Sequence, residues 1–375
     1  MRIKTVSFCN HELEWRFEPI HFSNLALLVG LSGVGKTQIL KGISSLKDIA
    51  NGKSLNGLAW DITFLTKDEV ECQWIGEFET KKQTGVISED EENNARFKIL
   101  YEKLWMDSNL IVERSSNEIQ FQGKITPKLS PFQSVIHILN QEDDIAPVQE
   151  GFNKILYSEN FRSVNPFYGL LHRSLLAERT QENLSLDSIK DSNMSIPVKL
   201  VLVYQHYSEI FNNIKNSFIE IFTQVEDIKI EAIEEGNDLL FGDFFIQIKE
   251  KGVNKWILQN NISSGMLKTL AHISELYLAP EGTVILIDEF ENSLGVNCID
   301  VVTDLLLENK SLQFILTSHH PYIINNIAME YWKIVTRRGG VVTVRDAKDF
   351  NLGKSRHQAF LQLINLEEYS EGIKI

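Results

Sequence analysis

The run Gly30-Leu-Ser-Gly-Val-Gly-Lys-Thr37 limits the folds open to this chain more than any other feature of its sequence. It follows Asn24-Leu-Ala-Leu-Leu-Val29, a short and almost wholly apolar segment of the kind that is buried in a parallel sheet. From Thr37 to Leu46 the apolar residues recur at helical spacing. A strand, a glycine loop and a helix in this order direct backbone N–H groups and a helix N-terminus toward one point. The run therefore predicts a phosphate-binding loop.

The side chains of this loop suit a nucleotide bound with a metal ion. The Lys36 ammonium would reach the β- and γ-phosphates, and the Thr37 hydroxyl would bind Mg²⁺. The glycines let phosphate oxygens approach the backbone closely. The predicted nucleotide-binding residues of the loop are Gly30, Ser32, Gly33, Gly35, Lys36 and Thr37.

A second apolar strand, Val284-Ile-Leu-Ile287, ends in the two carboxylates Asp288 and Glu289. A buried strand of this kind can carry a metal-binding carboxylate from the sheet to the phosphate site. We assign Asp288 to Mg²⁺ and Glu289 to the general base that polarises the water attacking the γ-phosphate. Buried strands often end in Asp, so the signal gains its weight from the preceding phosphate loop.

Two other segments could contribute to the same chemistry. The turn Ser263-Ser264-Gly265 precedes a helical apolar pattern, so a serine there could simply cap a helix, or the helix N-terminus could present a second anion site. The strand Leu312-Gln-Phe-Ile-Leu-Thr-Ser318 ends at His319 and His320, either of which could hydrogen-bond a γ-phosphate. Alone, these histidines would be ordinary surface or core residues.

The rest of the chain predicts an α/β fold with insertions. Short alternating segments between Leu58 and Ile125 predict antiparallel hairpins, and Ser134-Val-Ile-His-Ile-Leu139 predicts another strand. Residues 148–225 are mostly helical in pattern, with the best helix expected over Val198–Val225. We therefore expect an N-terminal lobe over 1–140, a helical insertion over 141–225 and a C-terminal lobe over 226–375.

Composition excludes several classes of protein. The 51 acidic and 37 basic residues give a net charge of −14, which disfavours a broad electrostatic surface for nucleic acid or anionic lipid. The three cysteines are too few and too scattered for a disulfide framework, and no pair has CxxC spacing. No window approaches the roughly 20 apolar residues of a membrane span. We expect a cytoplasmic protein with no membrane partner.

Taken in order, GLSGVGKT, ISSGMLKTLA, VILIDEFENSL and FILTSHHPYIINN resemble the Walker A, signature, Walker B with D-loop, and H-loop motifs of ABC-type ATPases. More narrowly, the chain resembles the soluble RecF/SMC/OLD-like branch. The resemblance implies a P-loop ABC-ATPase-like mixed sheet with an antiparallel β subdomain and a helical insertion. It is carried by the N-terminal 50 residues and by roughly 260–330.

The resemblance also implies residue roles. Ser263, Ser264 and Gly265 match the signature turn that contacts nucleotide, and His319 matches the H-loop histidine better than His320. Gln141, after the expected 134–139 strand, would be the Q-loop glutamine that contacts Mg²⁺ and the attacking water, with Gln133 as its rival. The segment Leu294-Gly-Val-Asn297 lacks the D-loop Asp of the family.

By this resemblance the first hypothesis is an ATPase whose two copies sandwich two ATP molecules with Mg²⁺ and control a partner. The partner would be a separate effector protein, a nuclease or toxin, in bacterial anti-phage defence. Only about 50 residues follow His320, too few for the appended nuclease domain of the OLD enzymes.

Two other classes compete with it. A RecF-like DNA-binding repair ATPase needs a basic surface, and the most concentrated cationic spot here is Arg337-Arg338 with Arg345, expected to be solvated near a hairpin. A scaffold without ATPase activity is disfavoured because the residues of the Walker motifs and the H-loop histidine are all present.

Overall fold

The computed structural model describes residues 1–82, 96–116, 118–157, 184–192, 194–232, 244–293, 299–350, 352–353, 356–366, 369 and 373–374. These residues form two compact units. The first comprises Met1–Ser158, Glu281–Glu289 and Lys310–Ile375, and the second comprises Glu159–Pro280 and Phe290–Asn309. The ranges 1–140, 141–225 and 226–375 stay a prediction, and the compact units follow different boundaries.

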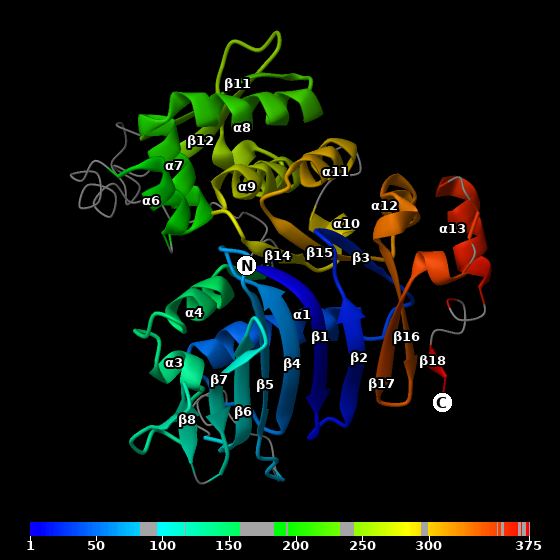
Figure 1. Ribbon diagram of the computed structural model, residues 1–375. Helices are drawn as coiled ribbons and strands as arrows, with labels where there is room; N and C mark the ends of the chain where they lie inside the picture. The colour runs from blue at the N-terminus through cyan, green and yellow to red at the C-terminus, as the bar shows by residue number, and fades with distance from the viewer. Residues whose placement is uncertain are drawn as a thin grey trace. The chain divides into compact units, whose positions relative to one another are not determined.

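The first unit contains the phosphate loop and one large mixed sheet (Figure 1). Its strands are β1 (Arg2–Asn10), β2 (Trp15–His21), β3 (Leu25–Val29), β4 (Leu58–Leu65), β5 (Glu71–Phe78), β6 (Ile99–Met106), β7 (Asn109–Arg114), β8 (Ile119–Phe121), β9 (Lys124–Ile125), β10 (Ile155–Tyr157), β14 (Val284–Ile287), β15 (Gln313–Ser318), β16 (Trp332–Arg338), β17 (Val341–Asp346) and β18 (Ile373–Lys374). Its helices are α1 (Lys36–Ala50), α3 (Val135–Ile138), α4 (Ala146–Asn153), α12 (Pro321–Asn326) and α13 (Arg356–Asn365).

The order of strands in this sheet is β10-β14-β15-β3-β16-β17-β2-β1-β4-β5-β6-β7-β8-β9. The first five of these are mutually parallel, and the run from β2 to β9 is antiparallel. Strand β15 lies between β3 and β14, so the strand before the phosphate loop and the strand before Asp288 are second neighbours. Because parallel strands end at the same edge of a sheet, their following residues meet there.

One apolar core lies between α1 and the sheet. The α1 residues Ile39, Leu40, Ile43 and Leu46 are buried in the same cluster as aromatic residues of the antiparallel strands. Trp74, for example, makes an edge contact with Phe152 of α4, with 5.0 Å between ring centroids. The amphipathic spacing of α1 read from the sequence therefore corresponds to its buried face, and it fixes the helix that follows the phosphate loop.

A buried polar network ties the antiparallel strands to the segment that follows them. Glu102 on β6 and Arg114 on β7 are 1% and 3% exposed and form an ion pair at 3.5 Å. The Glu102 carboxylate accepts hydrogen bonds from Trp74 Nε1 at 3.0 Å, from the Ser134 hydroxyl and from the Val135 backbone N–H at 3.0 Å. The charge is thus fully surrounded by donors, as a buried carboxylate requires.

This network corrects the strand expected over 134–139. The Ser134 side chain accepts the Ile136 N–H and caps helix α3, so the segment is helical. Among the alternating segments between Leu58 and Ile125, the strands expected at Trp60–Phe64, Val70–Ile75, Leu110–Glu113 and Glu118–Gln122 are confirmed as β4, β5, β7 and β8. Strands β2 and β6 were not anticipated.

The second unit is helical with a small antiparallel sheet. Its elements are α6 (Leu186–Asp191), α7 (Ile196–His206), α8 (Ser208–Ile221), β11 (Val225–Ala232), β12 (Phe244–Glu250), β13 (Ile257–Leu258), α9 (Ser264–Leu278), α10 (Phe290–Ser293) and α11 (Ile299–Glu308). The single helix expected over Val198–Val225 is wrong, because Tyr207 leaves the helical conformation at φ −132° and ends α7 before α8 begins. The Tyr207 hydroxyl donates to the Leu184 carbonyl at 2.7 Å.

Candidate functional site

The phosphate loop connects β3 to α1 in the first unit, as the sequence predicts. Two of its glycines are required by the fold. A Cβ at Gly30 would lie 2.5 Å from the Val335 carbonyl oxygen, and Gly35 has φ +107° where it caps α1. The Lys36 ammonium donates to the carbonyls of Gly30 and Leu31 at 2.6 and 2.9 Å, so it lies over the loop that it would serve.

Thr37 and Asp288 meet across the sheet although 251 positions separate them. The Thr37 hydroxyl donates to both carboxylate oxygens of Asp288, at 3.1 and 2.9 Å. A hydroxyl and a carboxylate beside a phosphate loop are oxygen donors of the kind that Mg²⁺ prefers. The two residues therefore fit the metal role assigned to them.

Glu289 is the next residue and is exposed at the same sheet edge. Its backbone adopts φ +48°, a left-handed conformation that is uncommon for a residue with a side chain. Its N–H donates to the hydroxyl of Thr317 on β15 at 2.8 Å. The turn that presents this carboxylate is thus held by a side chain of the neighbouring strand.

The two histidines after β15 have different environments. His320 is half-buried and its Nδ1 accepts the Tyr322 N–H at 3.3 Å, which caps α12. His319 is exposed at the end of the strand. Capping thus engages Nδ1 of His320, and the assignment of His319 as the H-loop histidine stays a prediction.

The signature turn lies in the second unit. Ser263 caps α9, with its hydroxyl accepting the Met266 N–H at 3.2 Å, so the capping interpretation is confirmed for this serine. Ser263 and Ser264 are exposed. A Cβ at Gly265 would meet nothing within 4 Å, and its φ is not positive. Nothing among the described residues requires a glycine there.

Gln141 does not occupy the position expected for it. It lies in the turn after helix α3 rather than at the end of a strand, and its side chain donates to Asn140 Oδ1 at 3.2 Å. Gln133 precedes the same helix, and its carbonyl accepts from Arg114 at 2.7 Å. On the side of β14 away from β15, the parallel neighbour is β10, whose Tyr157 pairs with Leu286. Residues 158–183 after it, and the segment Leu294–Asn297, lie outside the described residues.

The contacts of two side chains beside the phosphate loop were not expected from the sequence. The Arg337 guanidinium stacks on the Trp15 ring at 4.0 Å, and a Cβ at Gly35 would lie 3.0 Å from the same ring. Arg337 also donates to the Gly33 carbonyl at 3.5 Å. Arg337 is therefore half-buried, which corrects the expectation that it is solvated, whereas Arg338 is exposed. The sequence signal that could have pointed to this contact was the hairpin expected near Arg337, which the structure confirms as β16 and β17.

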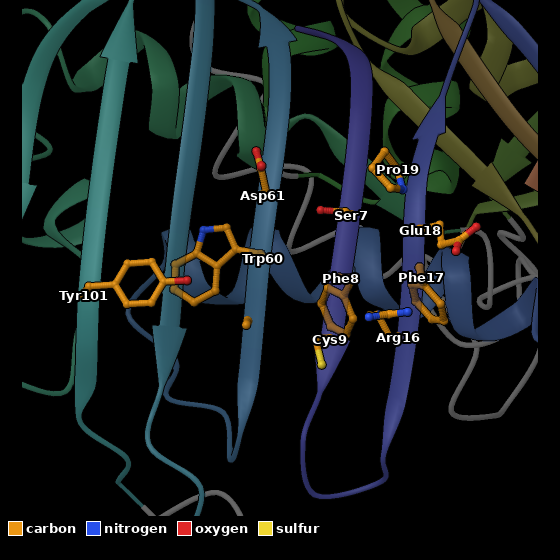
Figure 2. A pocket seen from close by; sticks show the side chains of 11 residues that line it. Ser7, Phe8, Cys9, Arg16, Phe17, Glu18, Pro19, Trp60, Asp61 and Tyr101 are labelled. Carbon is orange, nitrogen blue, oxygen red and sulfur yellow. The ribbon is translucent and has the colours of Figure 1, made fainter. Parts of the chain in front are cut away.

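A hollow of about 460 Å³ lies on the face of the antiparallel strands that is remote from α1 (Figure 2). Its polar lining includes Ser7, Cys9, Arg16, Glu18 and Asp61, none of which is a predicted site residue. Burial raises the pKa of the Cys9 thiol, which disfavours the reactive thiolate. The hollow carries no arrangement that we connect with catalysis.

Across the described ranges, no helix combines the length and apolar character needed to cross a bilayer.

Comparison with known proteins identifies the family and the fold. Residues 25–325 match the family described as "AAA domain, putative AbiEii toxin, Type IV TA system". No curated protein matches the chain. Among solved structures, it is similar to one titled "Crystal structure of the SmcHead bound to the C-winged helix domain of ScpA", at 17% identity over 92% of this chain and 97% of that chain, with a TM-score of 0.54.

A second similar structure is the SMC head domain from Thermotoga maritima, at 15% identity over 92% of this chain and 99% of that chain, with a TM-score of 0.45. At identities this low, a structural similarity shows the fold alone. The similarity to the first structure is the one that supports the fold assignment. Since the family match covers most of the sequence, the chain belongs to this AAA-domain family, and its fold is that of an SMC head domain.

Proposed function

We propose that this protein binds ATP with Mg²⁺ and hydrolyses it to ADP and phosphate. One observation supports this more than any other: Thr37 of the phosphate loop and Asp288 of β14 share hydrogen bonds at one sheet edge, with Glu289 directly beside them. When bound, Mg²⁺ would neutralise phosphate charge, and Thr37 and Asp288 would hold it. The Lys36 ammonium would leave its carbonyl partners for the β- and γ-phosphates.

In the proposed reaction a water oxygen attacks the γ-phosphorus, and the bond to the oxygen bridging the β- and γ-phosphates breaks. The Glu289 carboxylate takes the proton of that water, and His319 donates a hydrogen bond to a γ-phosphate oxygen. Both residues follow strands that end at the same sheet edge as β3, which supports their joint action. We retain Gln141 and its rival Gln133 only as weaker candidates for a contact with Mg²⁺ or water.

The base of the nucleotide would lie against the planar surface formed by Trp15 and Arg337. Both side chains border the phosphate loop, through Gly35 and Gly33 respectively. Aromatic rings and guanidinium groups both stack on nucleobases.

Two copies of the chain would sandwich two ATP molecules, each phosphate loop facing the signature turn of the other copy. The turn Ser263-Ser264-Gly265 opens the 15-residue helix α9, whose N-terminus carries partial positive charge. Gly265 supports an external ligand here, because a glycine in the first turn weakens a helix and no internal contact demands one.

The nucleotide-dependent dimer would control a separate effector protein, a nuclease or toxin, in anti-phage defence. The toxin–antitoxin wording of the family description supports such a context. The similar SMC head structure holds that head bound to the C-winged helix domain of ScpA, which supports a protein partner for this chain as well. A RecF-like DNA clamp has weaker support, because the net charge is −14 and Arg337 is engaged with Trp15.

Mixing two inactive variants tests the proposal. Lys36→Ala removes the phosphate-binding cation and Ser263→Arg blocks the signature turn, so neither variant should hydrolyse ATP alone. A mixture under conditions of subunit exchange should regain activity, since each heterodimer assembles one intact composite site. Ser263→Ala is the control for loss of the cap, and it should cost about 0.5 to 2 kcal/mol of stability without eliminating turnover. A mixture no faster than its parents, with heterodimers confirmed by native mass spectrometry, would refute the sandwich.

A further inference from the structure

Thr317 is a buried polar residue in the centre of the parallel strands. It is 1% exposed on β15, where it pairs with Leu28 of β3, and the preceding Leu316 pairs with Ile287 of β14. It is therefore placed between the strand that leads to the phosphate loop and the strand that leads to Asp288. A buried hydroxyl must find partners for both its donor and its acceptor capacity.

Both capacities are used at the candidate site. The Thr317 hydroxyl donates to Asp288 Oδ1 at 2.6 Å and accepts the Glu289 backbone N–H at 2.8 Å. Asp288 Oδ1 also receives the Thr37 hydroxyl at 3.1 Å. One side chain thus contacts two consecutive residues with different assigned roles, the metal-binding carboxylate and the general base.

The contact with Glu289 falls where the backbone is strained. Glu289 has φ +48°, and left-handed conformations of non-glycine residues persist where the surroundings hold them. Its N–H lies two residues after the end of β14 at Ile287 and donates to the Thr317 hydroxyl. Without that acceptor, the turn could relax and the Glu289 carboxylate would point elsewhere.

We propose that Thr317 is a positioning residue for ATP hydrolysis: its hydroxyl sets the direction of Glu289 and fixes the Asp288 carboxylate. This inference rests on the proposed ATPase function. Thr317 would act through its two neighbours and touch neither the nucleotide nor the water. Its loss should slow turnover while leaving ATP binding intact, because Lys36 and the loop backbone, which bind the phosphates, do not depend on it.

The test compares Thr317→Val, Thr317→Ala and Thr317→Ser with wild type. Displacement of a reacting group by about 1 Å costs roughly 10²-fold in rate. We expect kcat to fall about 10- to 100-fold in the Val and Ala variants, with KM and ATP affinity within about threefold of wild type. Thr317→Ser keeps the hydroxyl and should restore kcat to within about threefold. Thermal denaturation shows which of the Thr317→Val and Thr317→Ala variants is the better folded. The kcat of that variant is then compared with the kcat of Thr317→Ser.

A matched control removes an equivalent hydroxyl elsewhere. Thr66 directly follows β4 and is 5% exposed, and its hydroxyl accepts the Val70 backbone N–H at 3.2 Å. Thr66→Val should leave kcat unchanged. A double variant adds a second readout: if Thr317 acts through Glu289, then Thr317→Val should lower the residual rate of Glu289→Gln by less than about threefold.

The outcomes separate the two hypotheses. A wild-type protein without Lys36-dependent ATP hydrolysis would refute the proposed function, and the inference with it. An active wild type with Thr317→Ala or Thr317→Val at normal kcat would refute the inference alone. Equal losses in the Ser and Ala variants would also overturn it, and full additivity with Glu289→Gln would refute the part of the proposal that concerns Glu289.

Discussion

Substitution of Gly265 by alanine should stabilise the protein and yet slow its hydrolysis of ATP. Gly265 is the second residue of α9, its φ is not positive, and a Cβ there would meet nothing within 4 Å. Alanine is favoured over glycine inside a helix by about 0.5 to 1 kcal/mol. For a domain of about 150 to 250 residues, such a gain raises Tm by about 1 to 4 °C.

The loss of rate follows from the same methyl group. An N–H donor needs about 2.7 to 3.1 Å to an oxyanion, and removing one such donor costs roughly 10² to 10³ in rate. A methyl group at the start of α9 would hold a γ-phosphate from the other copy beyond that distance. We therefore expect Gly265→Ala to lower the steady-state ATPase rate about 100-fold while the thermal midpoint rises.

Gly252 provides the matched control. It lies in the turn between β12 and β13, also with nothing within 4 Å of its Cβ position, but at φ +77°. Alanine there is strained, so Gly252→Ala should lower Tm and leave the ATPase rate of the folded protein unchanged. A Gly265→Ala variant that is more stable and fully active would refute the argument that a ligand approaches this turn.

Three further predictions concern other parts of the molecule. Glu289→Gln should bind ATP normally and hydrolyse it about 10² to 10⁴ times more slowly, measured by calorimetry and single-turnover kinetics; near-normal turnover would move the base elsewhere. Trp15→Ala should weaken ATP binding by about 1 to 3 kcal/mol but leave inorganic triphosphate binding unchanged, and an equal loss for both ligands would contradict base stacking. Burial raises the pKa of Glu275 to about 7, with Lys199 opposing the shift, so its contribution to stability is complete below about pH 4.5 and is lost as the pH rises through 7. Glu275→Gln should therefore flatten the dependence of urea-unfolding free energy on pH between about 5 and 8, and an unchanged slope would exclude Glu275 as its source.

Local motifs made part of the site predictable. Lys36 and Thr37 belong to eight contiguous residues between a strand and a helix, and Asp288 and Glu289 directly follow another strand. Such features depend on near neighbours in the sequence. The parallel strands β3, β14 and β15 were predictable for the same reason, because runs of apolar residues bounded by polar ones suit burial on both faces.

Features decided by distant residues were not predictable. Five apolar or neutral residues after Ser134 are equally compatible with a strand and a short helix. The choice is made by the Ser134 cap and by Glu102, a residue 32 positions earlier. The assignment of Gln141 relied partly on that strand, so it is now only a weaker candidate.

The contacts of Thr317 and Trp15 could not be predicted, for a related reason. A threonine near the end of a strand can face either side, and only the pairing of β15 with β14 brings its hydroxyl to Asp288 and Glu289. Trp15 meets Arg337 only because β17 pairs with β2.

The buried ion pair of Glu102 and Arg114 has a consequence for how tolerance to mutation would be distributed along the chain. Removing one partner of a buried pair leaves the other charge buried and unpaired, which costs about 3 to 5 kcal/mol of stability. That is a large part of the stability of a typical domain. In a library of variants selected for function, both positions should be depleted as strongly as Lys36, although neither would touch a nucleotide. A double replacement by apolar residues of similar volume should survive far better than either single change. Intolerance at a charged position in this protein is therefore a poor guide to catalysis unless the pair is varied together.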